Sequence, residues 1–195
     1  DAFLFAPRAG PADAATLACA ATYTGGRVWH YGDAASDAGA FAPDLLAHVQ
    51  DTDVGLEAVL RVRATHGLAL GAYHGAFYLR SSDLLALPNV SPAHAYSAVV
   101  RVDETLSAAA AGFQAALLYT TPGGERRIRV INAAFPVSND PRELALSADG
   151  PGLACLLLRM AAEKACDAGR LEDAREALMN VLADVSRASR ALFGG

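Results

Sequence analysis

The spacing of apolar and polar residues changes twice along the 195-residue chain. Up to about residue 50, short apolar runs alternate with helical patterns. Ala2–Phe5 and Val28–Tyr31 are typical of buried strands. Pro11 with Asp13 opens a helical stretch that runs to Tyr23, and a Thr-Gly-Gly sequence at 24–26 ends it. A second, short helix is predicted to start at Pro43. The order strand, helix, strand, helix predicts an α/β layer.

The pattern from about residue 55 to 137 is that of β-structure. In Val59–Arg63, aliphatic and basic residues alternate, which places Arg61 and Arg63 on one face of a strand. A Thr-Pro-Gly-Gly sequence at 121–124 predicts a hairpin turn. Further strands are predicted at Tyr73–Leu79, Tyr96–Val102, Phe113–Thr120 and Arg127–Phe135. Short strands separated by turn signals favour a β-sandwich or a barrel.

After Pro141 the apolar residues recur with the period of a helix. Pro151 predicts a helix start, because proline suits the first turn, and Gly169 predicts its end. A second helix carries an apolar stripe from Leu171 to Val185. Two helices joined by a short turn predict an antiparallel helical hairpin.

These patterns predict a mixed α and β chain of several parts. Residues 1–52 are interpreted as the C-terminal end of an α/β domain, 53–139 as a β-sandwich, and 140–195 as the start of a helical domain. The chain opens on Asp1 and an apolar stretch, and two strands are few for an α/β sheet. We therefore expect it to be a piece of a longer protein.

Composition and charge exclude several classes of protein. Hydrophobic residues make up 53% and charged residues 19%, which excludes a disordered tail. The net charge of −5 does not fit a general nucleic-acid binder. No apolar run approaches the length of about 20 residues that a membrane span needs. Cys19, Cys155 and Cys166 form no CxxC pair, so we expect buried thiols in a reducing, cytosolic compartment.

The inventory of catalytic residues is thin, and we predict no catalytic and no metal-binding residue. Asp103 and Glu104 are adjacent on a strand and point to opposite faces, so they make a poor acid/base couple. Gly123 and Gly124 belong to the predicted hairpin and lack the lysine of a phosphate loop. The five histidines show no metal-ligand spacing, and we interpret them as structural: His30, His48, His66, His74 and His94.

The arginines of the β-stretch are more informative. Residues 59–130 hold seven arginines and four acidic residues, a charge of +3 that leaves −8 for the rest of the chain. Arg61 and Arg63 lie on one face of a strand, as do Arg127 and Arg129. Paired guanidinium groups on a rigid sheet can bind carboxylates bidentately. The alternative is an ordinary solvated outer face of a sandwich.

A set of ordered motifs extends over nearly the whole chain: TGG at 24–26, LEAVLRVR at 56–63, YHGAFYLRSSDLL at 73–85, LPNV at 87–90, ALLYT at 116–120, GERRIRV at 124–130 and LEDAREAL at 171–178. With these motifs the chain resembles the cargo-adaptor subunit of the COPII vesicle coat. The resemblance implies the end of the α/β trunk, a β-sandwich and the first helices of the helical domain. It implies no enzyme activity and no cofactor in this stretch, because the family's zinc finger lies outside it.

The resemblance also implies a role, partners and a site. The family's adaptor associates peripherally with the cytosolic face of the endoplasmic reticulum, beside a paralogous GTPase-activating subunit, and captures the cytosolic tails of cargo and SNARE proteins for transport to the Golgi. Its Arg-x-Arg pocket for acidic signals such as Asp-x-Glu corresponds to Arg61 and Arg63. A leucine bordering that pocket corresponds to Leu118.

The chain departs from the family pattern at two positions. His66 replaces the family's usual lysine, and Ala76 replaces an asparagine, so the preferred cargo is not implied.

A purely structural coat segment with solvated arginines is the main alternative function. An enzyme is the third hypothesis, but the chain lacks a nucleophile elbow, a metal cluster and a phosphate loop.

Overall fold

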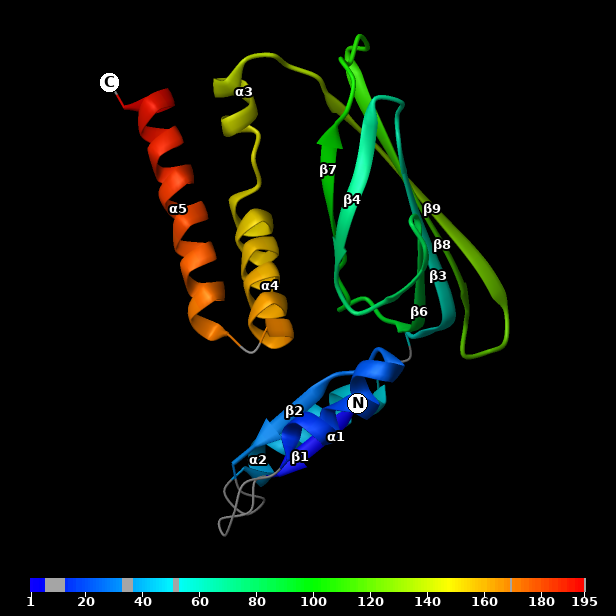
Figure 1. Ribbon diagram of the computed structural model, residues 1–195. Helices are drawn as coiled ribbons and strands as arrows, with labels where there is room; N and C mark the ends of the chain where they lie inside the picture. The colour runs from blue at the N-terminus through cyan, green and yellow to red at the C-terminus, as the bar shows by residue number, and fades with distance from the viewer. Residues whose placement is uncertain (6–12, 33–36, 51–52, 169, 195) are drawn as a thin grey trace. The chain divides into compact units, whose positions relative to one another are not determined.

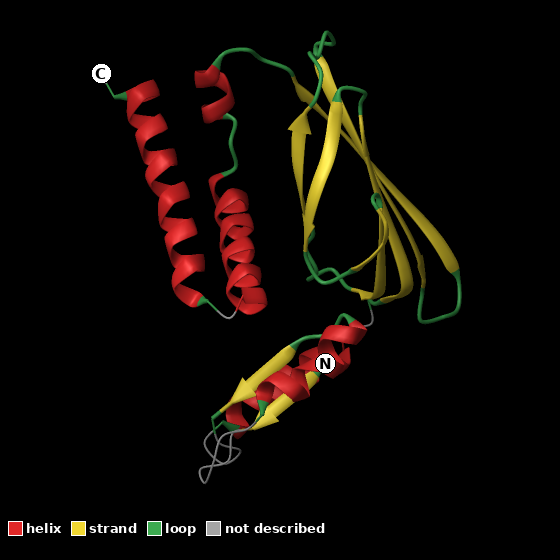
Figure 2. Ribbon diagram, viewed as in Figure 1, coloured by secondary structure: helices red, strands yellow, loops and turns green. Residues whose placement is uncertain are grey.

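The computed structural model describes residues 1–5, 13–32, 37–50, 53–168 and 170–194. The chain divides into two compact units that interleave along the sequence. The first comprises Asp1–Arg63, Ala76–Ala95 and Phe113–Asn132, and the second comprises Ala64–Gly75, Tyr96–Gly112 and Ala133–Gly195. Figure 2 shows the helices in red and the strands in yellow. The boundaries expected from the sequence, at residues 52 and 139, stay a prediction.

The N-terminal elements form a small α/β layer, as predicted. Strands β1 (Ala2–Phe5) and β2 (Val28–Tyr31) pair in parallel, and α1 (Ala14–Thr24) connects them. The carboxylate of Asp13 accepts a hydrogen bond of 3.1 Å from the backbone N–H of Thr16, which caps the helix start. The glycine that follows α1 adopts a left-handed conformation and ends the helix.

Helix α2 (Ala38–Gln50) begins five residues before Pro43, so the predicted start was wrong. Proline suits a first turn but is tolerated deeper in a helix when packing compensates for the missing hydrogen bond. That packing comes from Phe41, whose ring contacts the rings of Phe3, Phe5 and Tyr31 at centroid distances of 5.0–5.6 Å. The helix therefore starts early enough to bring Phe41 onto the two strands.

A five-stranded sheet carries the Arg61 strand and has the order β5-β6-β3-β8-β9, of which all but β5 are labelled in Figure 1. Strand β6 pairs in antiparallel fashion with both β5 and β3. Leu85 and Leu87 of β6 are fully buried and, with Ala58 of β3, form the core of this sheet. The strands are β3 (Gly55–Ala64), β5 (Tyr78–Ser81), β6 (Leu84–Val90), β8 (Ala110–Thr120) and β9 (Arg126–Pro136).

A two-stranded antiparallel sheet consists of β4 (Leu68–His74) and β7 (Ser97–Val102). The single strand predicted at 73–79 was therefore wrong, because the structure splits it between two sheets. Gly75, with φ of 150°, lies at the break and turns the chain after β4. With three sheets and its helices, the described chain is mixed α and β with a β-sandwich, which confirms the predicted fold class.

The C-terminal helices are α3 (Pro141–Leu146), α4 (Gly150–Ala168) and α5 (Leu171–Phe193). Helices α4 and α5 lie side by side, as the predicted helical hairpin requires (Figure 1). The residue predicted to end α4, Gly169, lies outside the described residues. The short α3, which the sequence patterns did not distinguish, starts at a proline and is capped by the Asp140 carboxylate.

The three cysteines are free and exposed, so the expectation of buried thiols was wrong. Cys155 and Cys166 lie on α4, which packs against α5 and β4 and stays exposed at both cysteines. Cys19 lies on the outer side of α1. An apolar pattern on a helix predicts which side chains can be buried, but it does not provide the neighbours that bury them.

Candidate functional site

Arg61 and Arg63 lie near the end of β3 and are both exposed, with half-buried Val62 between them. This alternation confirms that the two guanidinium groups leave the strand on the same side. No hydrogen bond or ion pair is recorded for Arg63 within the described residues. Arg63 is therefore available to a ligand, whereas Arg61 has a different environment.

The second cation, Arg61, is bound by a carboxylate of the same chain. Its Nε and Nη2 each lie 2.6 Å from Oδ2 of Asp83. The register explains this contact, because Arg61 is paired with Leu84 at the start of β6. Asp83 precedes Leu84 in the two-residue turn that joins β5 to β6. Pairing of β3 with β6 therefore brings a carboxylate of the turn beside the arginine.

The Asp83 carboxylate is held by more than one group. Its Oδ1 accepts a hydrogen bond of 3.1 Å from the Ser81 hydroxyl. The hydrogen bond from Arg61 is the main reason that the pKa of Asp83 is lowered from its usual value, and burial acts against it. The side chain of Asp83 nevertheless stays 35% exposed and that of Arg61 45% exposed, so solvent and ligands can reach the pair.

Leu118 is half-buried on β8, which is hydrogen-bonded to β3 in the sheet. Its neighbour Tyr119 lies close to Gly55, since a Cβ atom on that glycine would be 2.9 Å from the tyrosine ring. Leu118 is therefore placed beside the beginning of β3, whereas Arg61 and Arg63 lie near its end. The three predicted residues are on adjacent strands without forming one compact cluster.

The β8–β9 hairpin carries three more arginines, and each has a different environment. The turn is closed by a hydrogen bond of 2.8 Å from the Thr121 N–H to the Glu125 carbonyl, which confirms the predicted hairpin. Arg126 donates to the backbone carbonyl of Glu57 at 3.1 Å and to a threonine hydroxyl on β8. These bonds anchor the hairpin to β3, so Arg126 has a structural role.

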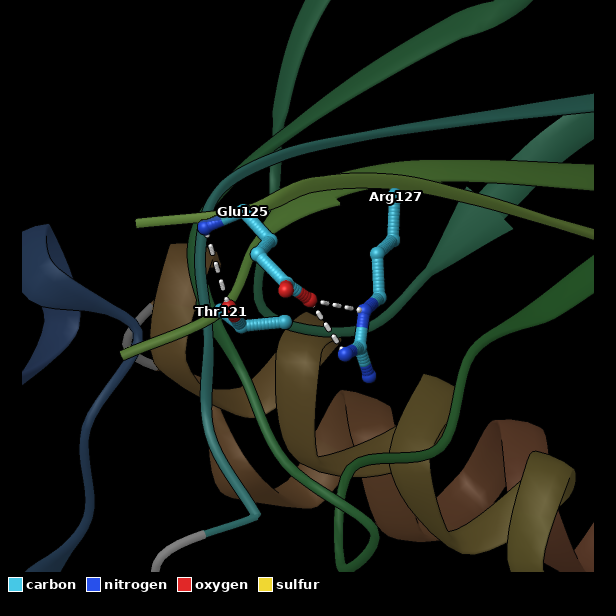
Figure 3. A network of polar contacts seen from close by, with 3 residues as sticks. All are labelled: Thr121, Glu125 and Arg127. Carbon is cyan, nitrogen blue, oxygen red and sulfur yellow. Dashed lines mark hydrogen bonds and ion pairs between the residues drawn. The ribbon is translucent and has the colours of Figure 1, made fainter. Parts of the chain in front are cut away.

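Arg127 and Arg129, the second predicted pair, differ in the same way as the first. Figure 3 shows the contacts of Arg127. Arg127 donates through Nε and Nη2 to the carboxylate of Glu125, whose backbone N–H donates to the Thr121 hydroxyl at 3.2 Å. The pKa of Arg127 is raised chiefly by that hydrogen bond with Glu125. Arg129 has no recorded polar partner among the described residues. Both arginines line a cavity of about 570 Å³ at the turn end of the hairpin, and Tyr119 lines it as well.

Three of the five histidines contact a carboxylate in the described structure, and their structural role stays a prediction. His74 is buried and bonded to Glu163, and His48 and His66 lie beside single carboxylates. Within the described part of the chain, no three His, Cys, Asp or Glu side chains gather in a way that could hold a metal ion. Among the same residues, no helix is both long and apolar enough to cross a membrane.

The residue of the candidate site that sequence reasoning missed is Asp83, which contacts Arg61. It was counted among the four acidic residues of the β-stretch, but nothing in the spacing linked it to an arginine 22 positions away. The available signal was the polar Arg-Ser-Ser-Asp run at 80–83, bounded by apolar residues, which is typical of a hairpin turn. Recognising that turn would have predicted β5 and β6, although not their neighbour in the sheet.

Comparison with known proteins identifies the relatives of the chain. Residues 55–138 match the family model of the Sec23/Sec24 β-sandwich domain. Protein transport protein Sec24A of Bos taurus is 38% identical over 183 residues, which cover 91% of this chain and 17% of the relative. Protein transport protein SEC24 of Pyricularia oryzae is 38% identical over 199 residues, covering 100% of this chain and 20% of the relative.

A solved structure agrees with the sequence relatives. The crystal structure of the human COPII-coat protein Sec24c matches with a TM-score of 0.86 and 29% identity, over 100% of this chain and 26% of that one. The chain thus spans about a fifth of the length of the curated relatives cited above. The resemblance, the β-sandwich domain and the fold all agree, and the chain belongs to the Sec24 family of the COPII inner coat.

Proposed function

We propose that the chain is a non-catalytic adaptor segment of the COPII coat that helps to capture acidic export signals of cargo for transport from the endoplasmic reticulum to the Golgi. The observation that carries this proposal is the exposure of Arg61 and Arg63 on one side of β3. A guanidinium group has the geometry to bind a carboxylate through two parallel hydrogen bonds. Arg63, which has no recorded polar partner in the described structure, is available for such a contact.

The shape of the site favours an extended peptide as the ligand. Leu118 lies beside the start of β3 and the arginines near its end, on neighbouring strands. With a rise of about 3.3 Å per residue, an extended segment of roughly five residues would reach from the leucine to the arginines. Its carboxylates would contact Arg61 and Arg63 while an apolar side chain contacts Leu118.

The proposal includes the location and the partners of the whole protein. The whole protein would act as an adaptor on the cytosolic face of the endoplasmic reticulum membrane and on COPII vesicles, as a heterodimer with a Sec23-type subunit. The cytosolic tails of cargo and SNARE proteins would be its ligands. Membership of the Sec24 family supports these assignments, because the relatives are by name protein transport proteins and a COPII-coat protein.

A titration with a fluorescent peptide tests the proposal. The probe is a terminally blocked peptide containing Asp-Ala-Glu, and the readout is fluorescence polarisation with the full chain. We expect Arg61→Ala combined with Arg63→Ala to weaken binding about tenfold or more, because charge-assisted hydrogen bonds are lost. The control is Arg80→Ala combined with Arg142→Ala, which removes the same charge from two other exposed positions.

The alternative function is a structural coat segment that makes no contact with cargo. The bond between Arg61 and Asp83 favours it, since an arginine that is already paired can serve the fold alone. Under that alternative, the Asp-Ala-Glu peptide binds the wild-type and the double variant equally. Added salt separates the two functions as well, because binding at paired arginines weakens as ionic strength rises.

A further inference from the structure

Asp83 occupies the part of Arg61 that a ligand carboxylate would use. Both Nε and Nη2 of the guanidinium lie 2.6 Å from the same oxygen, Oδ2. These two nitrogens form one edge of the guanidinium, the edge that binds a carboxylate side-on. An incoming carboxylate on that edge and the Asp83 carboxylate would repel each other, because both carry a negative charge.

The position of Asp83 is set by the sheet and by a neighbouring hydroxyl. The turn between β5 and β6 places it next to Leu84, which is the register partner of Arg61. Ser81 donates to the second oxygen, Oδ1, at 3.1 Å. Because the side chain of Asp83 is 35% exposed, it can rotate into solvent when a ligand arrives. Arg63, two residues away, has no such internal partner recorded in the described structure.

We propose that Asp83 is an internal competitor for the arginine site, so that Arg61 accepts a ligand carboxylate only when that carboxylate displaces Asp83. This inference rests on the proposed function and adds a selectivity-determining residue to it. A ligand with one carboxylate binds Arg63 and leaves the Arg61–Asp83 pair intact. A ligand with two carboxylates displaces Asp83 and pays for that with part of its binding energy. The competition therefore reduces the advantage of the second carboxylate.

The test measures peptide affinity in the full chain with Asp83→Asn. Exposed ion pairs contribute little, so we expect the variant to bind the blocked Asp-Ala-Glu peptide up to about fivefold more tightly than the wild-type. A peptide with Asn-Ala-Glu, which has one carboxylate, is expected to gain less. The matched control is Asp103→Asn, which removes the same charge from an exposed aspartate whose arginine lies 3.8 Å away. It is expected to leave both affinities unchanged.

A second variant covers the case in which Asp83→Asn unfolds more easily. Ser81→Ala keeps every charge and removes only the hydroxyl that holds Oδ1, so a smaller gain in the same direction is expected. Unchanged or weaker binding of Asp-Ala-Glu by both variants, at unchanged melting temperature, overturns the competition. Failure of the proposed function looks different, because the Arg61 and Arg63 double variant would then bind as the wild-type does. A gain in Asp103→Asn as large as in Asp83→Asn would also overturn the inference.

Discussion

His74 on β4 and Glu163 on α4 form a polar contact of 2.6 Å, between Nδ1 of the imidazole and Oε2 of the carboxylate. His74 is 8% exposed, and its other ring nitrogen, Nε2, is buried without a hydrogen-bond partner in the described structure. The contact joins a strand and a helix that are 89 residues apart in sequence. Glu163 is thus the polar group that satisfies a buried histidine between the two-stranded sheet and the helical hairpin.

Removal of that carboxylate should destabilise the second unit. We expect Glu163→Ala to lower the free energy of unfolding by about 1–3 kcal/mol, because His74 would be left buried with neither nitrogen satisfied. Glu163→Gln, which keeps a hydrogen-bond acceptor, should lower the free energy of unfolding less. Urea denaturation followed by circular dichroism measures the effect. Glu172→Ala, on the exposed face of α5, is the control, and an equal loss there would contradict the prediction.

The left-handed glycine after α1 should not tolerate a side chain. Gly25 has φ of 66°, and a Cβ atom there would lie 3.2 Å from the Asn89 carbonyl oxygen. Gly124 in the β8–β9 turn has φ of 85° but open space around it. We expect backbone strain of about 1–2 kcal/mol in either alanine variant. Gly25→Ala should lose more stability in thermal unfolding than Gly124→Ala, owing to the added clash. Equal losses of stability in the two variants would contradict this, because the Asn89 carbonyl would then move away from the added Cβ atom at no cost.

Truncation of the buried leucine of β6 should affect the first unit strongly. Leu85 is 0% exposed, whereas Leu79, its register partner on β5, is 58% exposed. We expect Leu85→Ala to lower the free energy of unfolding by about 2–5 kcal/mol, because a cavity remains in a packed core. Leu79→Ala should change it far less. Denaturant titrations of the two variants make the comparison, and similar losses would argue against this placement of the core.

Tyr31 should make stability depend on alkaline pH. Burial, and then its hydrogen bond of 2.9 Å to the Asp44 carboxylate, raise the pKa of Tyr31 to about 12 from an ordinary 10.0. A raised pKa means that the folded state favours the neutral phenol. The contribution of Tyr31 to the stability of the fold is therefore complete below pH 10 and is lost as the pH rises through about 12. Ultraviolet titration of tyrosinate in wild-type and Tyr31→Phe proteins measures this. Ionisation of Tyr31 at the ordinary pKa of 10.0 would contradict the prediction.

The local features were predictable because neighbouring residues create them. Strand β2, the turn at 121–124 and the α4–α5 hairpin all follow from patterns within a few residues. The start of α2 was not predictable in this way. The contacts of Phe41 with β1 and β2 outweigh the preference of Pro43 for a first turn, and such contacts are absent from a local pattern.

In the candidate site, too, some features follow from the local sequence and others depend on contacts between distant segments. The sequence alone determined that Arg61 and Arg63 share a face, because side chains alternate along any strand. It also determined the family, through motifs spread over nearly the whole chain. Only the tertiary structure decided that Arg61 is paired while Arg63 has no such partner among the described residues, since the pairing of β3 with β6 brings Asp83 beside one arginine. Strand order and register arise from contacts between distant segments, and a charge pattern along the chain does not specify them.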